Sequence, residues 1–160
     1  MVKKILTVFL IISLAFTVVS CDKEKVFGHA ELTIALTDDF SEIEAESFDA
    51  AYSNGESVVG IYRISFAAGF NQGIPDFLTA REFASFYMKA SGRNVEIKEA
   101  HNVPYYEYTE EQEGLMNSYL ASFFRSKYAY FVILFATSEA LYPDLAAEFL
   151  DFADTVIFTK

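Results

Sequence analysis

The chain has 160 residues and carries 23 acidic side chains against 12 Lys and Arg, which gives a formal net charge of −11. So acidic a chain lacks the basic surface that nucleic-acid binding requires, and nucleic acid is therefore excluded as an expected partner. The length fits one domain of common size, and the single Cys excludes a disulfide within the chain.

Residues 1–20 are predicted to be an export signal. Lys3 and Lys4 form a short basic start, and the stretch Ile5–Val19 that follows is apolar apart from three Ser and Thr residues. Ser20 is the small residue at the end of the signal. These are the three parts of a secretory signal. A membrane-spanning helix needs about 20 apolar residues, and this run is shorter.

Cys21 follows directly and resembles the lipid-modified cysteine of bacterial lipoproteins, whose thiol receives a diacylglycerol. The alternative is an ordinary secretory signal that leaves Cys21 a free thiol. A single acyl chain binds a membrane only marginally, whereas two or three chains hold a protein there stably. We therefore expect the lipid on Cys21 to hold the protein at the cell membrane or in the outer envelope. The expected parts are a lipoprotein signal peptide (1–20), a flexible lipidated tether (21–29) and one folded domain (30–160).

In the first half of this domain, the sequence pattern predicts strands joined by a hairpin. Apolar residues alternate over residues 31–36, which predicts a strand with one face in water. Two further strands are predicted over residues 48–52 and 57–66. Asn54-Gly55 lies between them and is the strongest short hairpin signal, because both central residues of a type I′ turn need positive φ.

A helix is predicted after a loop at residues 67–76, which contains two glycines and a proline. Thr79 is able to cap the first free N–H groups, and Glu82, three residues later, completes a capping box. Gly92 then ends the helix.

In the second half of the domain, the sequence pattern predicts further strands and a closing helix. Residues 128–136 form an uninterrupted apolar run, which predicts a strand buried on both faces. Pro143 suits the first turn of the last helix. Residues 115–125 are ambiguous, because their apolar spacing favours a helix although a tight turn into the next strand is also plausible. The other predicted strands lie at residues 94–100, 105–109 and 155–158.

Several features in this order resemble one known family. They are a first strand ending in a Leu-x-x-x-Phe step, a hairpin, a Thr-capped helix, the run Tyr-Ala-Tyr-Phe-Val-Ile-Leu-Phe-Ala and the closing Phe-Ala-Asp-Thr-Val-Ile-Phe. Together, over residues 30–158, they are similar to the PsbP-like (Mog/PsbP) domain. The resemblance implies an α+β fold, with a central antiparallel sheet covered by helices on both faces as an α/β/α sandwich. In that fold residues 115–125 are a strand, and this expectation replaces the helix.

The resemblance implies a role in binding or assisting other proteins, without a shared catalytic set, and no family site residue is transferred. The residues themselves point the same way. Cys21 is committed to lipid, and His29 and His101 are the only histidines. The dense acids of residues 38–46 lack the glycine and the spacing of a calcium loop, so a solvated loop is favoured. We expect no enzyme activity, no cofactor and no metal.

Tyrosines are the candidate ligand-binding residues, with Tyr105, Tyr106 and Tyr108 first among them. A tyrosine offers an apolar ring with a polar tip, which suits recognition of proteins, peptides or sugars. The alternative is structural, since aromatic side chains favour strands and pair across them. Three more tyrosines are predicted on neighbouring strands, Tyr119, Tyr128 and Tyr130.

The expected function is that of a membrane-anchored, non-catalytic binding or accessory lipoprotein of the cell envelope, with an envelope protein or a small ligand as partner. A second hypothesis is an envelope hydrolase or metal-dependent enzyme, which needs His101 beside Glu99 and Glu107. A third is a structural subunit of an assembly, which requires a large apolar surface patch.

We expect Cys21→Ser to abolish membrane attachment and to leave an uncleaved precursor or a released soluble form, because serine has no thiol to receive the lipid. Incorporation of radiolabelled palmitate by cells expressing either form measures this. Equal incorporation by the wild type and the variant would refute the lipoprotein assignment.

Overall fold

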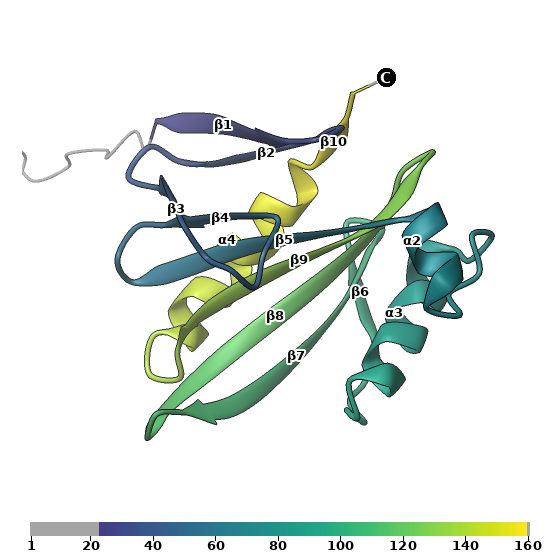
Figure 1. The fold of residues 1–160 in the computed structure, drawn as a ribbon. Coiled ribbons are helices and arrows are strands. Elements are labelled where there is room, and N and C mark those ends of the chain that lie inside the picture. The colour runs from purple at the N-terminus through teal and green to yellow at the C-terminus, as the bar shows by residue number, and fades with distance from the viewer. Residues whose placement is uncertain (1–22, 160) are drawn as a thin grey trace, which may run out of the picture.

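Residues 23–159 of the computed structural model form two antiparallel sheets and three helices (Figure 1). The predicted signal peptide (1–20) and Cys21 lie outside these described residues. Within residues 23–159, no helix has the length and apolar character needed to cross a membrane. The elements are β1 (Glu24–His29), β2 (Leu32–Thr37), β3 (Ser41–Ile43), β4 (Ala50–Ser53), β5 (Ser57–Ser65), α2 (Phe66–Asn71), α3 (Ala80–Ala90), β6 (Lys98–Ala100), β7 (Val103–Gln112), β8 (Leu115–Arg125), β9 (Ala129–Ser138), α4 (Tyr142–Asp154) and β10 (Ile157–Phe158).

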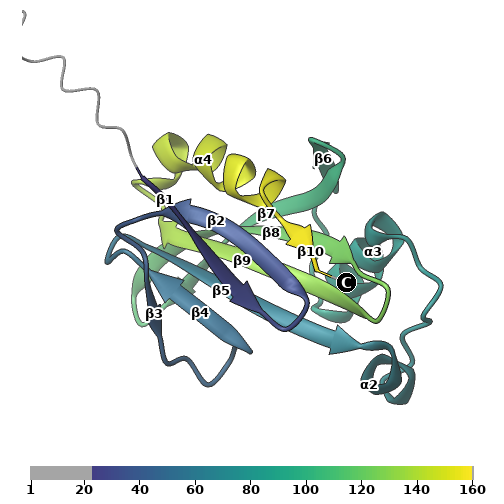
Figure 2. The same cartoon turned by 90° about the horizontal axis from the view of Figure 1, so that it is seen from above.

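The larger sheet has seven strands in the order β3-β4-β5-β9-β8-β7-β6, and the smaller sheet has three in the order β1-β2-β10. The four longest strands, β5, β9, β8 and β7, are neighbours in the larger sheet. The smaller sheet joins distant parts of the chain, because β10 follows α4 and pairs with β2 (Figure 2). The predicted central antiparallel sheet is therefore confirmed.

Strand β9 is buried on both faces, as its apolar run predicts. Phe131, Ile133 and Phe135 share one core cluster with residues of β2 and α4. Tyr130 and Val132 point to the opposite face and share a second cluster with residues of α3. The core thus has two halves, and β9 separates them.

Helices alone do not cover both faces of the larger sheet, so the predicted α/β/α sandwich is not confirmed in full. On the α4 face, Leu32, Ile34 and Leu36 of β2 are fully buried in the same cluster as Phe149 of α4. The smaller sheet is therefore a second cover beside α4 (Figure 2). The physical reason is the alternation in β2, whose apolar face needs a surface to pack against.

The tether predicted at residues 21–29 is wrong from Glu24 onward, because Glu24–His29 forms β1 and pairs with β2 over its whole length. Phe27 is the buried residue of this strand, and its ring centroid lies 4.5 Å from that of Tyr52. The other residues of β1 are exposed or partly exposed, the apolar Val26 among them, because β1 is an edge strand whose outer face meets water.

The hairpin at Asn54-Gly55 is confirmed, but its turn is not of the predicted type I′. Of the two residues, only Gly55 has positive φ (91°). The side-chain oxygen of Asn54 instead accepts hydrogen bonds from two backbone N–H groups that follow it, at 3.1 and 2.8 Å, and closes an Asx turn. Adjacent positive φ values, which type I′ turns require, occur at two other hairpins, His101-Asn102 and Glu113-Gly114.

Helix α3 begins and ends where the sequence predicts. The hydroxyl oxygen of Thr79 accepts a hydrogen bond from the N–H of Glu82 at 3.2 Å, and the Glu82 carboxylate accepts one from the N–H of Thr79 at 2.8 Å. This is the predicted capping box, and Gly92 follows the helix at φ 71°. The loop predicted at residues 67–76 is partly wrong, because Ser65 caps a first-turn N–H and starts α2.

Residues 115–125 form β8, as the resemblance implies and against the helical spacing of their apolar side chains. The reason is tertiary, since β8 pairs with β7 on one side and β9 on the other. Among the neighbouring predictions, the strand at 94–100 keeps only its last three residues, as β6, and the strand at 105–109 lengthens to Val103–Gln112.

Glu31, in the turn between β1 and β2, ties the smaller sheet to the larger one. Its carboxylate accepts hydrogen bonds from Arg63 of β5 at 2.9 and 3.3 Å and from the hydroxyl of Ser126 at 2.9 Å. Burial opposes ionisation of Glu31, but the hydrogen bonds from Arg63, from its own backbone and from Ser126 outweigh it and hold its pKa below the ordinary value.

We expect Ile133→Ala to lower the free energy of unfolding by about 2–5 kcal/mol, because Ile133 is fully buried and the loss leaves a cavity. Ile157→Ala is the matched control, since 65% of that side chain is exposed, and it should cost little. Chemical denaturation of both variants measures the difference. An Ile133 variant with the wild-type midpoint would mean that β9 is not the centre of the core.

We expect Glu31→Gln to destabilise the protein at neutral pH and to flatten its acid response. A carboxyl with a lowered folded pKa contributes stability that is present above its unfolded pKa of about 4.3 and is lost as pH falls through the lower folded value. Unfolding free energies measured from pH 7 downward should therefore converge for wild type and variant in acid. Glu99→Gln, which removes an exposed partner of Arg81, is the control and should change little.

Candidate functional site

The candidate tyrosines divide between the two faces of the larger sheet, because side chains alternate along β7. Tyr105 is partly buried against the core cluster that contains α4. Tyr106 and Tyr108 belong to the α3 face. The sequence analysis treated Tyr105, Tyr106 and Tyr108 as one candidate group, but the structure brings only Tyr106 and Tyr108 together.

A groove of about 460 Å³ lies on the α3 face, beside the C-terminal end of that helix. Five tyrosines line it together with Arg93, and we call it the tyrosine cleft. Small and aliphatic side chains of β8 and β9, including Ala121, Leu134 and Ala136, also line it. The five tyrosines are Tyr62, Tyr87, Tyr106, Tyr108 and Tyr119.

Tyr108 is held between two partners in this cleft. Its ring stacks on Tyr119, which lies directly opposite on β8, with centroids 4.8 Å apart and planes 10° apart. The guanidinium carbon of Arg93 lies 3.9 Å from the Tyr108 centroid. Arg93 also makes an ion pair with Glu110 at 2.9 Å. The cleft therefore contains a cation that stacks on an aromatic ring and is paired with a carboxylate.

The phenols of the cleft are uncharged at neutral pH, and burial raises the pKa of all five above the ordinary value for tyrosine, those of Tyr62, Tyr87, Tyr106, Tyr108 and Tyr119. Their accessibility differs, since Tyr106 and Tyr119 are only 1% and 6% exposed. These two rings serve packing first, as the structural alternative predicts, while the other three present partly exposed surface.

Two further candidate tyrosines of the sequence analysis, Tyr130 and Tyr128, lie outside the cleft. Tyr130 is buried, and its hydroxyl donates to the carbonyl oxygen of Pro75 at 2.7 Å and accepts from the N–H of Leu78 at 2.9 Å. It thus fixes the loop before α3. Tyr128 is exposed in the turn between β8 and β9.

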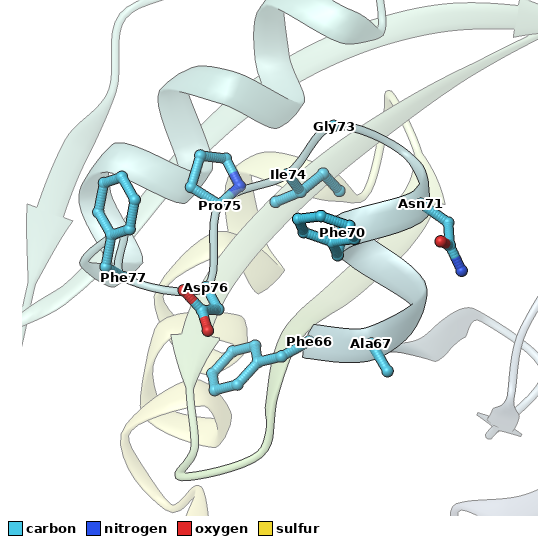
Figure 3. Close-up of a pocket in the computed structure, with 9 residues that line it drawn as sticks. All are labelled: Phe66, Ala67, Phe70, Asn71, Gly73, Ile74, Pro75, Asp76 and Phe77. Carbon is cyan, nitrogen blue, oxygen red and sulfur yellow. The ribbon is translucent and has the colours of Figure 1, made fainter.

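A second candidate surface lies around α2, and sequence reasoning missed it. Phe70 and Phe77 are 80% and 78% exposed, and they border a groove of about 790 Å³ lined mostly by apolar residues. Figure 3 shows Phe66 and Phe70 projecting from α2 toward the segment that carries Pro75 and Phe77. We call this surface the aromatic tip. Two phenylalanines in a loop rich in Gly were the signal available in the sequence.

Basic side chains adjoin the aromatic tip. Arg125 donates a hydrogen bond to the carbonyl oxygen of Asp76 at 3.0 Å, and its guanidinium carbon lies 5.3 Å from the Phe66 centroid. The ammonium group of Lys127 lies 5.3 Å from the ring of Tyr128. Asp76 is the charged residue among those lining the groove, and Arg125 places a positive charge beside it.

The catalytic arrangement considered for His101 does not form. His101 is exposed and lies 4.0 Å from Asp154. Glu107 binds Lys98 and accepts a hydrogen bond from the hydroxyl of Tyr142 at 2.6 Å, and Glu99 pairs with Arg81. Within residues 23–159, no three His, Cys, Asp or Glu side chains gather in a way that would hold a metal ion.

No known family model matches the chain, and no curated protein matches it in sequence. Solved structures do match. A protein of Bacteroides thetaiotaomicron is 13% identical with a TM-score of 0.60, and the match covers 86% of this chain and 48% of that one. The chain thus spans about half the length of that protein.

Cyanobacterial PsbP (CyanoP) of Synechocystis is similar over 89% of this chain and 96% of its own, at 11% identity and a TM-score of 0.57. LpqN of Mycobacterium tuberculosis, described as involved in cell envelope biogenesis, is 10% identical over 86% of this chain and 91% of its own, with a TM-score of only 0.44. The likeness to CyanoP confirms a PsbP-like fold and concerns the fold alone.

Proposed function

We propose that this protein is a lipid-anchored, non-catalytic accessory protein of the cell envelope, which binds a protein partner through the aromatic tip. The observation that carries the proposal is the exposure of Phe70 and Phe77, at 80% and 78%. Contiguous exposed apolar surface on a monomer marks an interaction site, because it is costly to leave in water. Aromatic side chains are also the residues most enriched at binding hot spots.

The position of the tip favours a protein over the anchoring membrane. Helix α2 lies at the end of the domain opposite the start of β1 in both views (Figures 1 and 2). Cys21 precedes the first described residue, Lys23, by two positions. A lipid on Cys21 would therefore place the start of β1 next to the bilayer, with the tip pointing away from it.

The chemistry of the tip describes the partner. The groove between Phe66, Phe70 and Phe77 accommodates apolar side chains, so the partner should present them. Arg125 lies beside that groove, against Phe66 and Asp76. The partner should therefore carry acidic residues around its apolar contact, which steers association and fixes orientation.

We expect a photoreactive phenylalanine analogue at position 70 or 77 of the full-length protein to form an adduct with one envelope protein in cells. The same analogue at Leu115 or Ile157 is the matched control, because these apolar side chains are also largely exposed (69% and 65%) and lie outside the tip. Mass spectrometry of the adducts identifies the partner.

The identified partner is then tested in a direct binding measurement with purified proteins. Phe70→Ser and Phe77→Ser should each weaken binding by about 2 kcal/mol or more, without lowering the free energy of unfolding. Arg125→Glu should slow association, most clearly at low salt. Adducts with lipid, with a second copy of this chain, or of equal yield at the control positions would contradict the proposal.

A further inference from the structure

We propose that the tyrosine cleft binds a small organic cation, such as a quaternary ammonium or guanidinium compound, between aromatic rings and a carboxylate. The cleft shares no lining residue with the aromatic tip. The inference therefore goes beyond partner docking, and each is tested without the other.

The cleft already holds one organic cation, the guanidinium group of Arg93. Its central carbon lies 3.9 Å from the ring centroid of Tyr108, and its Nη2 lies 2.9 Å from Oε2 of Glu110. A cation within about 6 Å of an aromatic face is attracted by the ring quadrupole, and the carboxylate adds a charge-assisted hydrogen bond. The position of Arg93 thus indicates that Tyr108 and Glu110 together suit an organic cation.

Further aromatic rings line the same cleft. Phe48, Tyr62 and Tyr87 line the same cleft and are partly exposed, so a ligand is able to reach them. Burial raises the pKa of Tyr62 and Tyr87, and their phenols stay neutral at physiological pH. Exposed aromatic faces are the groups that proteins use to recognise quaternary ammonium ligands, and this cleft offers several of them.

Size and charge also favour a small cation. The volume of about 460 Å³ is in the range of small-molecule sites. The net charge of −11 attracts cations over a long range and repels anions. Binding of an anion to Arg93 is further opposed by Glu110, which already neutralises the guanidinium group.

Arg93 is displaceable, because the contacts that hold it are partly in water. It follows Gly92 after the end of α3, and the exposed fractions of the Arg93 and Glu110 side chains are 26% and 50%. A partly exposed ion pair and a single cation–π contact are modest, and together they favour the bound position of Arg93 by about tenfold. An incoming cation takes over the face of Tyr108 and the carboxylate of Glu110, while the guanidinium group turns to solvent. Arg93 therefore competes with the ligand for this position.

Isothermal titration calorimetry of the full-length protein in detergent tests this with choline and methylguanidinium as probes. We expect Arg93→Gln to bind the probes about tenfold more tightly than wild type, because the internal competitor is gone. Glu110→Gln and Tyr108→Leu should each bind about tenfold more weakly. Arg81→Gln removes a similar surface arginine outside the cleft and should leave the affinity unchanged.

The uncharged isostere of choline, in which a tert-butyl group replaces trimethylammonium, separates charge from size. Binding of the isostere as tight as that of choline would overturn the proposal, because the cleft would then be merely apolar. Absence of binding by both wild type and Arg93→Gln would also overturn it, as would weaker binding by Arg93→Gln. Thermal unfolding identifies any variant that has lost its fold. Should Tyr108→Leu be one, the partly exposed Arg93 and Glu110 variants still decide the result.

Discussion

The two-sided burial of β9 is the constraint on which the rest of this structure depends. Phe131, Ile133 and Phe135 face one side, and Tyr130 and Val132 face the other. Each large apolar side chain gains about 1.5–3 kcal/mol from burial, so both faces need a cover. One cover comes from the two ends of the chain, as β1, β2, α4 and β10, and the other comes from its middle, as α3.

Both candidate surfaces lie where these covers end. Helix α3 has 11 residues, and the tyrosine cleft lies beside its C-terminal end, over residues of β5, β7, β8 and β9. The connection from β5 to α3, which includes α2, extends past the sheet and carries Phe70 and Phe77 (Figure 1). A sheet with long strands and short covering elements thus leaves concave and protruding surface at its margins, where binding residues are commonly found.

The two surfaces differ in chemistry, although both are aromatic. Phe70 and Phe77 have no polar atoms in their side chains, and the cation Arg125 lies at the margin of the tip. In the tyrosine cleft the cation Arg93 lies inside, stacked on Tyr108. Phenylalanine on a protruding loop suits insertion into a partner, whereas neutral tyrosines around a hollow suit enclosure of a small ligand.

The sequence by itself determined the features that depend on neighbouring residues: the capping box of Thr79, the hairpin at Asn54, and β9 as a doubly buried strand. Residues 115–125 were a strand only through the family resemblance, because the apolar spacing was that of a helix. Tertiary structure alone decided the remainder. It made β1 from a segment expected to be a tether, and it left Phe70 and Phe77 in water. Caps and turns are set by contacts a few residues apart, whereas exposure is set by which distant segments cover a side chain.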